Sequence, residues 1–173
     1  MSNKRKKQLD VDISAIPDIR KIKTKREWKK LENMYIEALS EITVPPDLRA
    51  NDILRINALI DEVYSQARFD YSFAKARVKK YERRLANAKK TLKLSFKKEK
   101  GQTADERDAL IMQFLETMPL KGDDEPLMTL VERWEEREIF MDAVIDNLTK
   151  ITDKMINGNG ALKLDAQGRG DQR

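Results

Sequence analysis

The sequence predicts an all-α protein, a long helical hairpin with heptad stripes and short flanking helices. Apolar residues recur at alternating spacings of three and four along two long stretches without proline, which is typical of amphipathic helices. Charged residues make up 38% of the chain and the hydrophobic class only 40%, so only long helices that bury narrow stripes could supply a core. Threonine-x-x-glutamate sequences precede two of the apolar runs and indicate helix starts.

The N-terminal segment, residues 1–24, is predicted to be a mobile basic arm. Residues 4–7 are a run of lysine and arginine. Pro17 interrupts the isoleucine repeat that follows, and because proline breaks helix interiors, this repeat does not indicate a helix. Thr24 and Glu27 then have the spacing of a capping box. We expect a short amphipathic helix to follow and to end before the Pro-Pro pair, as the first part of a helical domain over residues 25–157.

The second helix is expected from about Leu48 to about Lys98, with Asp47 as its N-cap, and would be about 75 Å long at 1.5 Å per residue. Its apolar stripe consists of Ile56, Ile60, Val63, Ala67, Tyr71, Ala74, Val78, Tyr81, Leu85, Ala88 and Leu92. Only the doubled spacing of four at Ala67–Tyr71 departs from a heptad, which is typical of a stutter that relaxes a supercoil.

Two further helices are expected after a break at Gly101. Thr103 and Glu106 form a second capping box, which predicts a short helix closed by Pro119. After an acidic loop, Pro126 suits the first position of a last helix. The seam of that helix is Leu130, Trp134, Arg137, Met141, Val144, Leu148, Ile151 and Met155, in which only Arg137 is polar.

The last helix is expected to end at Asn157–Gly158, a pair typical of a helix C-cap, and residues 158–173 to form a flexible C-terminal tail. Two long stripes joined by about 25 residues predict an antiparallel hairpin. Because a two-helix hairpin of this length has little core, its remaining apolar surface is expected to pack against other copies of the chain. The sequence therefore predicts a homo-oligomer.

Composition excludes several kinds of function. The chain has no cysteine and no histidine, which removes disulfides, catalytic thiolates and imidazoles, and metal sites built from them. It has no Walker-type glycine loop to hold nucleotide phosphates, and the acidic residues of the 121–125 loop are expected to be solvated rather than to hold a cation. We expect no catalysis, cofactor or metal, no membrane span, and a cytoplasmic location, in the host cell if a phage encodes the chain.

The net charge of +5 conceals a division along the chain. Residues 75–100 contain twelve basic and two acidic side chains, whereas residues 105–146 contain thirteen acidic and four basic ones. One interpretation is that the basic and acidic helices neutralise each other. The other is that part of the basic surface faces solvent and attracts phosphates, gaining free energy from counterion release. The candidate nucleic-acid-binding residues are Lys75, Arg77, Lys79, Lys80, Arg83, Arg84, Lys89, Lys90, Lys93 and Lys97.

Aromatic residues are interleaved with this basic region. Binders of single-stranded nucleic acid combine a positive track with aromatic faces on which bases stack. Tyr71 and Tyr81 belong to the apolar stripe and are expected in the core. Phe69 and Phe73 lie one turn apart on a flanking face, where either base stacking or packing between subunits is open to them.

The segment 74–81, Ala-Lys-Ala-Arg-Val-Lys-Lys-Tyr, resembles the Lys-Ala-Arg-apolar-x-x-Tyr segment of the UvsY family of phage recombination mediators, which contributes to single-stranded DNA binding there. The resemblance extends over about residues 53–164, mostly as layout. In this register the resemblance implies Lys75 and Arg77 as DNA-binding residues. Judged by the distance to Gly101, the segment 91–96 matches better, and the resemblance then implies Lys93 and Phe96. The N-terminal arm and the long basic helix depart from the family.

The resemblance implies an all-α homo-oligomeric ring that binds single-stranded DNA. Such a protein loads a RecA-like recombinase while it displaces a single-strand binding protein, and needs no catalysis. The sequence therefore favours a noncatalytic, oligomeric, single-stranded DNA-binding accessory protein of recombination or replication. The alternative is a coiled-coil scaffold or assembly adaptor without a nucleic-acid role, in which the opposite charges pair within or between subunits.

Overall fold

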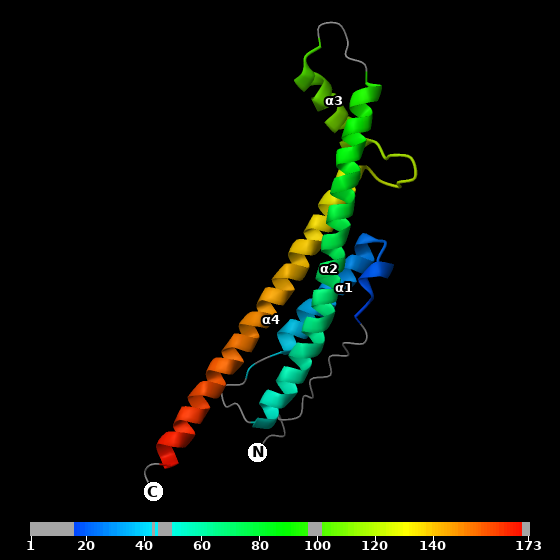
Figure 1. Ribbon diagram of the computed structural model, residues 1–173. Helices are drawn as coiled ribbons and strands as arrows, with labels where there is room; N and C mark the ends of the chain where they lie inside the picture. The colour runs from blue at the N-terminus through cyan, green and yellow to red at the C-terminus, as the bar shows by residue number, and fades with distance from the viewer. Residues whose placement is uncertain (1–15, 43, 45–49, 97–101, 171–173) are drawn as a thin grey trace. The chain divides into compact units, whose positions relative to one another are not determined.

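The structure, a computed structural model, describes residues 16–42, 44, 50–96 and 102–170, and only the backbone of Ala50 and residues 159–170. These residues form a 3-10 turn, η2 (Ile19–Lys21), and four α-helices: α1 (Lys25–Glu41), α2 (Ala50–Ser95), α3 (Ala104–Thr117) and α4 (Leu127–Gly170) (Figure 1). The described part of the chain contains no strand, and α2 packs against α4. The predicted all-α fold with a long helical hairpin is confirmed.

The chain divides into two compact units. Unit 1 comprises Met1–Asp70 and Phe140–Arg173, and unit 2 comprises Tyr71–Ile139. Because α2 and α4 each continue across this division, each unit contains one part of both long helices.

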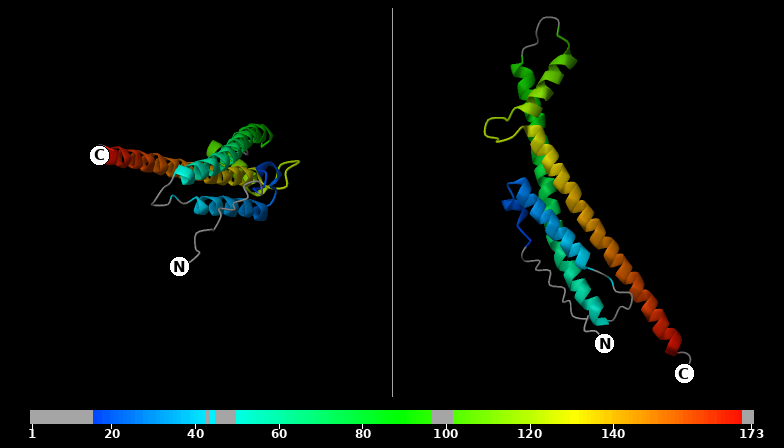
Figure 2. Two further views of the ribbon diagram at one scale, coloured as in Figure 1. Left: turned by 90° about the horizontal axis from the view of Figure 1, so that it is seen from below. Right: turned by 180° about the vertical axis from the view of Figure 1, so that it is seen from behind.

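In unit 1, α1 contacts both long helices. It lies alongside the N-terminal part of α2 (Figures 1 and 2), and the rings of Trp28 and Tyr35 make edge contacts with Phe140 of α4, at centroid distances of 5.7 and 6.4 Å. The predicted capping box starts α1, because Thr24 accepts a hydrogen bond from the Glu27 amide and the Glu27 carboxylate accepts one from the Thr24 amide. This local pairing satisfies two amides that the helix itself leaves without partners.

A buried carboxyl group joins α1 to α2. The Tyr35 hydroxyl donates to Asp70 Oδ2 at 2.7 Å, and Gln66 Nε2 donates to Asp70 Oδ1 at 3.1 Å. Neither Tyr35 nor Asp70 has any exposed surface. Removal from water disfavours the charged form and raises the Asp70 pKa to about 6, although the two hydrogen bonds and Arg20 oppose the shift, while Asp18 adds to it. The same burial raises the pKa of Tyr35.

Residues 16–24 differ from the arm expected over residues 1–24. Ile16, Ile19 and Ile22 are buried, and Asp18 caps η2 by accepting a hydrogen bond from the Arg20 amide. The Asp18 carboxylate also pairs with the Arg20 guanidinium at 2.7 Å, and these hydrogen bonds lower the Asp18 pKa to about 2. The isoleucine repeat therefore anchors this segment to unit 1. The rest of the predicted arm, the Asp47 cap and the Gly101 break lie outside the described residues.

In unit 2, the C-terminal part of α2 contacts α3, the loop after α3 and the first part of α4. The Phe96 ring meets the Phe114 ring of α3 at 6.2 Å, and Phe73 meets Trp134 of α4 at 5.7 Å. The second predicted capping box is present, with Thr103 and Glu106 bonded to each other's backbone amides. Pro126 comes directly before α4 rather than at its first position, and its carbonyl accepts from the Leu130 amide.

A tight turn shapes the loop between α3 and α4. The Asp123 amide donates to the Leu120 carbonyl at 2.9 Å, and Gly122, at the third position of the turn, has a φ of +92°. This is the backbone conformation of a type II turn, which side chains other than glycine disfavour. The turn directs Asp123 to Arg84 of α2, at 2.6 Å.

We expect Gly122→Ala to lower the free energy of unfolding by about 1 kcal/mol. No atom lies within 4 Å of the position an added Cβ would take, so the cost comes from the backbone conformation and not from a clash. Urea unfolding followed by circular dichroism measures it. Gly122→Asn is the control because asparagine tolerates positive φ better; a loss as large for asparagine as for alanine would contradict this explanation.

The C-terminal end of α4 corrects the expected helix boundary. The helix does not end at Asn157–Gly158 but continues to Gly170. A C-cap glycine stops a helix when it adopts positive φ, and among the described residues only Gly122 has that conformation. Gly158 therefore remains in helical backbone, where glycine is tolerated at a cost of about 1 kcal/mol relative to alanine.

Candidate nucleic-acid interface

Four basic side chains of unit 2 form an exposed surface on α2, here termed the basic face: Lys79, Lys80, Arg83 and Lys90. Lys79, Arg83 and Lys90 share one side of the helix because spacings of four and eleven residues are close to whole turns. Lys80 lies about 100° further round. The apolar positions Ala74 and Val78 are buried on another side of α2, so packing within the hairpin leaves the basic face in solvent.

The described residues provide no ion-pair partner for the basic face. The ion pairs of unit 2 involve other side chains: Arg84 with Asp123, Lys93 with Asp108, and Arg133 with Glu125. A surface with several unpaired cations raises the local concentration of phosphates. The acidic residues thus neutralise only part of the basic charge of α2: Arg84 and Lys93 are paired, whereas the basic face remains charged.

The other predicted site residues have different surroundings. Lys75 is exposed, and its ammonium group lies 3.1 Å from the Tyr71 hydroxyl, which accepts a hydrogen bond from it. Arg77 is half-buried and lies over the Phe73 and Trp134 rings at 5.0 and 5.7 Å. Lys89 is half-buried, and Lys97 lies outside the described residues. The structure therefore brings only part of the predicted set together on one open surface.

The aromatic residues of unit 2 are engaged within the unit. Tyr71, Phe73, Tyr81, Phe96 and Phe114 are half-buried and Trp134 is buried. Phe73 contacts Trp134, so its ring is not an open platform for a base. In unit 1, Phe69 is 45% exposed, but the Arg20 guanidinium lies over its ring at 5.3 Å.

The acidic residues of α4 in unit 2 form a separate charged surface. Glu132, Glu135 and Glu136 are exposed, and none of them is ion-paired with a described basic side chain. In the acidic loop, Asp123 and Glu125 each pair with an arginine. Within the described ranges, no three acidic side chains converge as ligands of a metal ion would.

One polar residue of the α4 seam was identified from the sequence, and a second one on α2 was missed. Arg137 is only 3% exposed, and its guanidinium lies 4.5 Å from the Trp134 ring centroid, an arrangement in which the ring face attracts the cation. Asp70 does not belong to the apolar pattern of α2, because its side chain is a carboxyl group. Asp70 lies three residues after Ala67 and four before Ala74, and this heptad spacing is the signal that could have predicted its burial.

The described helices include none that is long and apolar enough to cross a membrane. No family model, no curated protein and no solved structure matches the chain.

Proposed function

We propose that the protein is a noncatalytic accessory protein that binds single-stranded DNA through α2, with a role similar to that of UvsY-type recombination mediators. The observation that carries this proposal is the basic face: four exposed cations within about three turns of α2, without ion-pair partners among the described residues. Cations of this face that contact the phosphates of a strand would release the counterions condensed on it, and this release supplies sequence-independent affinity. The preference for single strands and the loading of a RecA-like recombinase rest on the sequence resemblance.

Oligomerisation is part of the proposal because one basic face is a weak site. Its four cations contact only a few phosphates, and such contacts lose affinity steeply as salt rises. Several copies that hold one strand together convert weak contacts into tight binding, because each further contact is intramolecular. A homo-oligomer would present several basic faces to one strand, and the acidic surface of α4 would remain available to protein partners, among them a single-strand binding protein.

The proposal is tested by replacing Lys79, Lys80, Arg83 and Lys90 together with glutamine, which preserves helix propensity. Each phosphate contact on a single strand contributes about 0.7 to the slope of log K against log salt, so the slope should fall by up to about 3. Fluorescence anisotropy of a labelled single-stranded oligonucleotide, titrated at several salt concentrations with a duplex competitor, measures the change.

The matched control replaces four other exposed cations with glutamine: Lys25, Arg26, Lys30 and Lys150. It changes the net charge equally but leaves the basic face intact, so it should retain most of the affinity and slope. If both variants lost the same amount of affinity for DNA, the loss would be explained by the lower net charge and not by the basic face. Unchanged affinity in a folded basic-face variant would refute the assignment.

The second candidate function is a coiled-coil scaffold or assembly adaptor. The ion pairs of Arg84 with Asp123 and of Lys93 with Asp108 favour it, because they use basic residues of α2 to hold the loop and α3 in place. If the wild-type protein binds neither single-stranded nor duplex DNA at low salt, this function replaces the first. Charge pairing within or between subunits would then make stability fall as salt is raised.

A further inference from the structure

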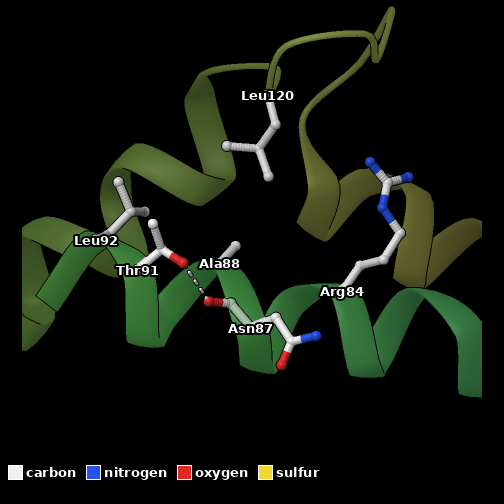
Figure 3. A pocket seen from close by; sticks show the side chains of 6 residues that line it. All are labelled: Arg84, Asn87, Ala88, Thr91, Leu92 and Leu120. Carbon is white, nitrogen blue, oxygen red and sulfur yellow. Dashed lines mark hydrogen bonds between the residues drawn. The ribbon is translucent and has the colours of Figure 1, made fainter. Parts of the chain in front are cut away.

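A pocket opens beside the basic face in unit 2. It has a volume of about 350 Å³ and lies between α2 and the loop after α3 (Figure 3). Its lining residues are Arg84, Asn87, Ala88, Thr91, Leu92 and Leu120. The volume lies in the range of small-molecule sites, which is roughly 300–1,000 Å³.

The walls of the pocket are apolar, with a cation at one end. Leu120 points from the loop toward α2, where Ala88 and Leu92 lie below it, and the Asn87 amide points away from this space (Figure 3). The Arg84 guanidinium is held by Asp123 at 2.6 Å. Besides aromatic rings, arginine planes and apolar side chains are surfaces against which proteins stack unpaired bases.

The pocket is within reach of a strand bound to the basic face. Lys80 precedes Arg84 by four residues, and Arg83 precedes Asn87 by four, so each pair lies one turn apart on the same side of α2. Phosphates held by Lys80 and Arg83 would place the attached bases near the mouth of the pocket. The positive charge around the mouth thus complements a nucleic-acid strand.

The engagement of the aromatic residues favours this pocket as a site for a base in unit 2. Single-strand binders usually stack bases on exposed aromatic rings, but the described aromatic residues of this unit are half-buried or buried. A base that leaves water on binding therefore needs another apolar surface, which Ala88, Leu92 and Leu120 offer.

We propose that the pocket receives one base of the bound single strand, held between the apolar side chains of α2 and Leu120, with Arg84 at its edge. This inference rests on the proposed function. It adds a contact that depends on the base to the contacts with phosphates, and it predicts that affinity depends on the presence of bases and not only on charge.

The test compares a single-stranded oligonucleotide with one of equal length that carries abasic sites throughout. The wild-type protein should bind the normal oligonucleotide at least about fivefold more tightly, because burial of about 40 Å² of base surface against apolar side chains gives that ratio. Ala88→Leu, which fills the pocket, should reduce the difference to less than twofold and leave the salt slope unchanged. Thr91→Leu is a second filling variant at an exposed position, in case Ala88→Leu disturbs the fold.

The matched control is Ala58→Leu, the same change at an exposed position of α2 outside both the pocket and the basic face, which should keep the preference for bases. Equal wild-type affinity for both oligonucleotides, or a preference that survives in folded filling variants, would overturn the pocket assignment and leave the proposed function standing. No binding to either oligonucleotide would instead overturn the proposed function. Analytical sedimentation of the filling variants tests whether a side chain of a second copy occupies the pocket instead. If these variants lose self-association but keep the preference for bases, the pocket is assigned to the second copy.

Discussion

Replacement of Tyr35 by alanine should destabilise the protein by about 3–5 kcal/mol, as truncation of a buried aromatic side chain does. Tyr35 has no exposed surface, so its removal leaves a cavity between α1, α2 and Phe140. It also deprives the buried Asp70 carboxyl of its 2.7 Å hydrogen bond. Urea unfolding of the full-length chain, followed by circular dichroism, should show a large decrease in the transition midpoint.

Tyr35→Phe separates the ring from the hydroxyl group. It keeps the packing and removes only the donor to Asp70, so we expect a loss of about 1.5–3 kcal/mol at pH 7, where the carboxyl is charged. At pH 5 the carboxyl is mostly protonated, because its pKa is about 6, and the loss should be smaller. An equal loss at both pH values would contradict the assignment of the charge to Asp70.

Replacement of Asp70 by asparagine should remove a pH dependence of stability. The folded-state pKa of about 6 is higher than the ordinary value of 3.8, so the folded state binds this proton more tightly than the unfolded state does. The contribution of Asp70 to stability therefore falls as pH rises from about 4 to about 6 and stays constant above that. Two pKa units correspond to at most about 3 kcal/mol.

The stability of Asp70→Asn relative to the wild type should therefore increase between pH 4 and pH 7. The amide of Gln66 can turn over so that its oxygen accepts from the new asparagine while the Tyr35 hydroxyl donates to the other atom, which keeps the cluster hydrogen-bonded. Taking the difference between the two proteins removes the contributions of Glu27 and Glu106, whose pKa values are lowered. Parallel profiles of the two proteins would show that Asp70 titrates normally.

The same residue shows where the sequence analysis reached its limit. The apolar pattern assigned Tyr71 to the seam of α2 and placed a stutter at Ala67–Tyr71. In the structure Asp70 is fully buried and Tyr71 is only half-buried, so the heptad continues through Asp70 and the doubled spacing of four moves to Ala74–Val78. Hydropathy cannot find such a position, because the carboxyl is tolerated only through partners on α1 and on the preceding turn of α2.

Local signals predicted the starts of helices better than the boundaries of the N-terminal arm and of the last helix. Thr24 and Thr103 bond to groups within three residues, so their capping boxes could be recognised without knowledge of the fold. Burial of Ile19 and the passage of α4 through Gly158 depend on the surroundings of these segments, which a local pattern does not contain. For the same reason, the charge pattern predicted cations on α2 but not that Asp108 and Asp123 would each pair with one of them.

Each of the two units contains one tryptophan, whose fluorescence can report on the unfolding of that unit. The chain contains two tryptophans, Trp28 in unit 1 and Trp134 in unit 2. The Trp28 indole donates to Glu32 at 2.7 Å, whereas Trp134 is buried beside the guanidinium groups of Arg77 and Arg137. Single-tryptophan variants can therefore follow the unfolding of each unit separately and reveal whether the continuous helices α2 and α4 make the two units unfold together.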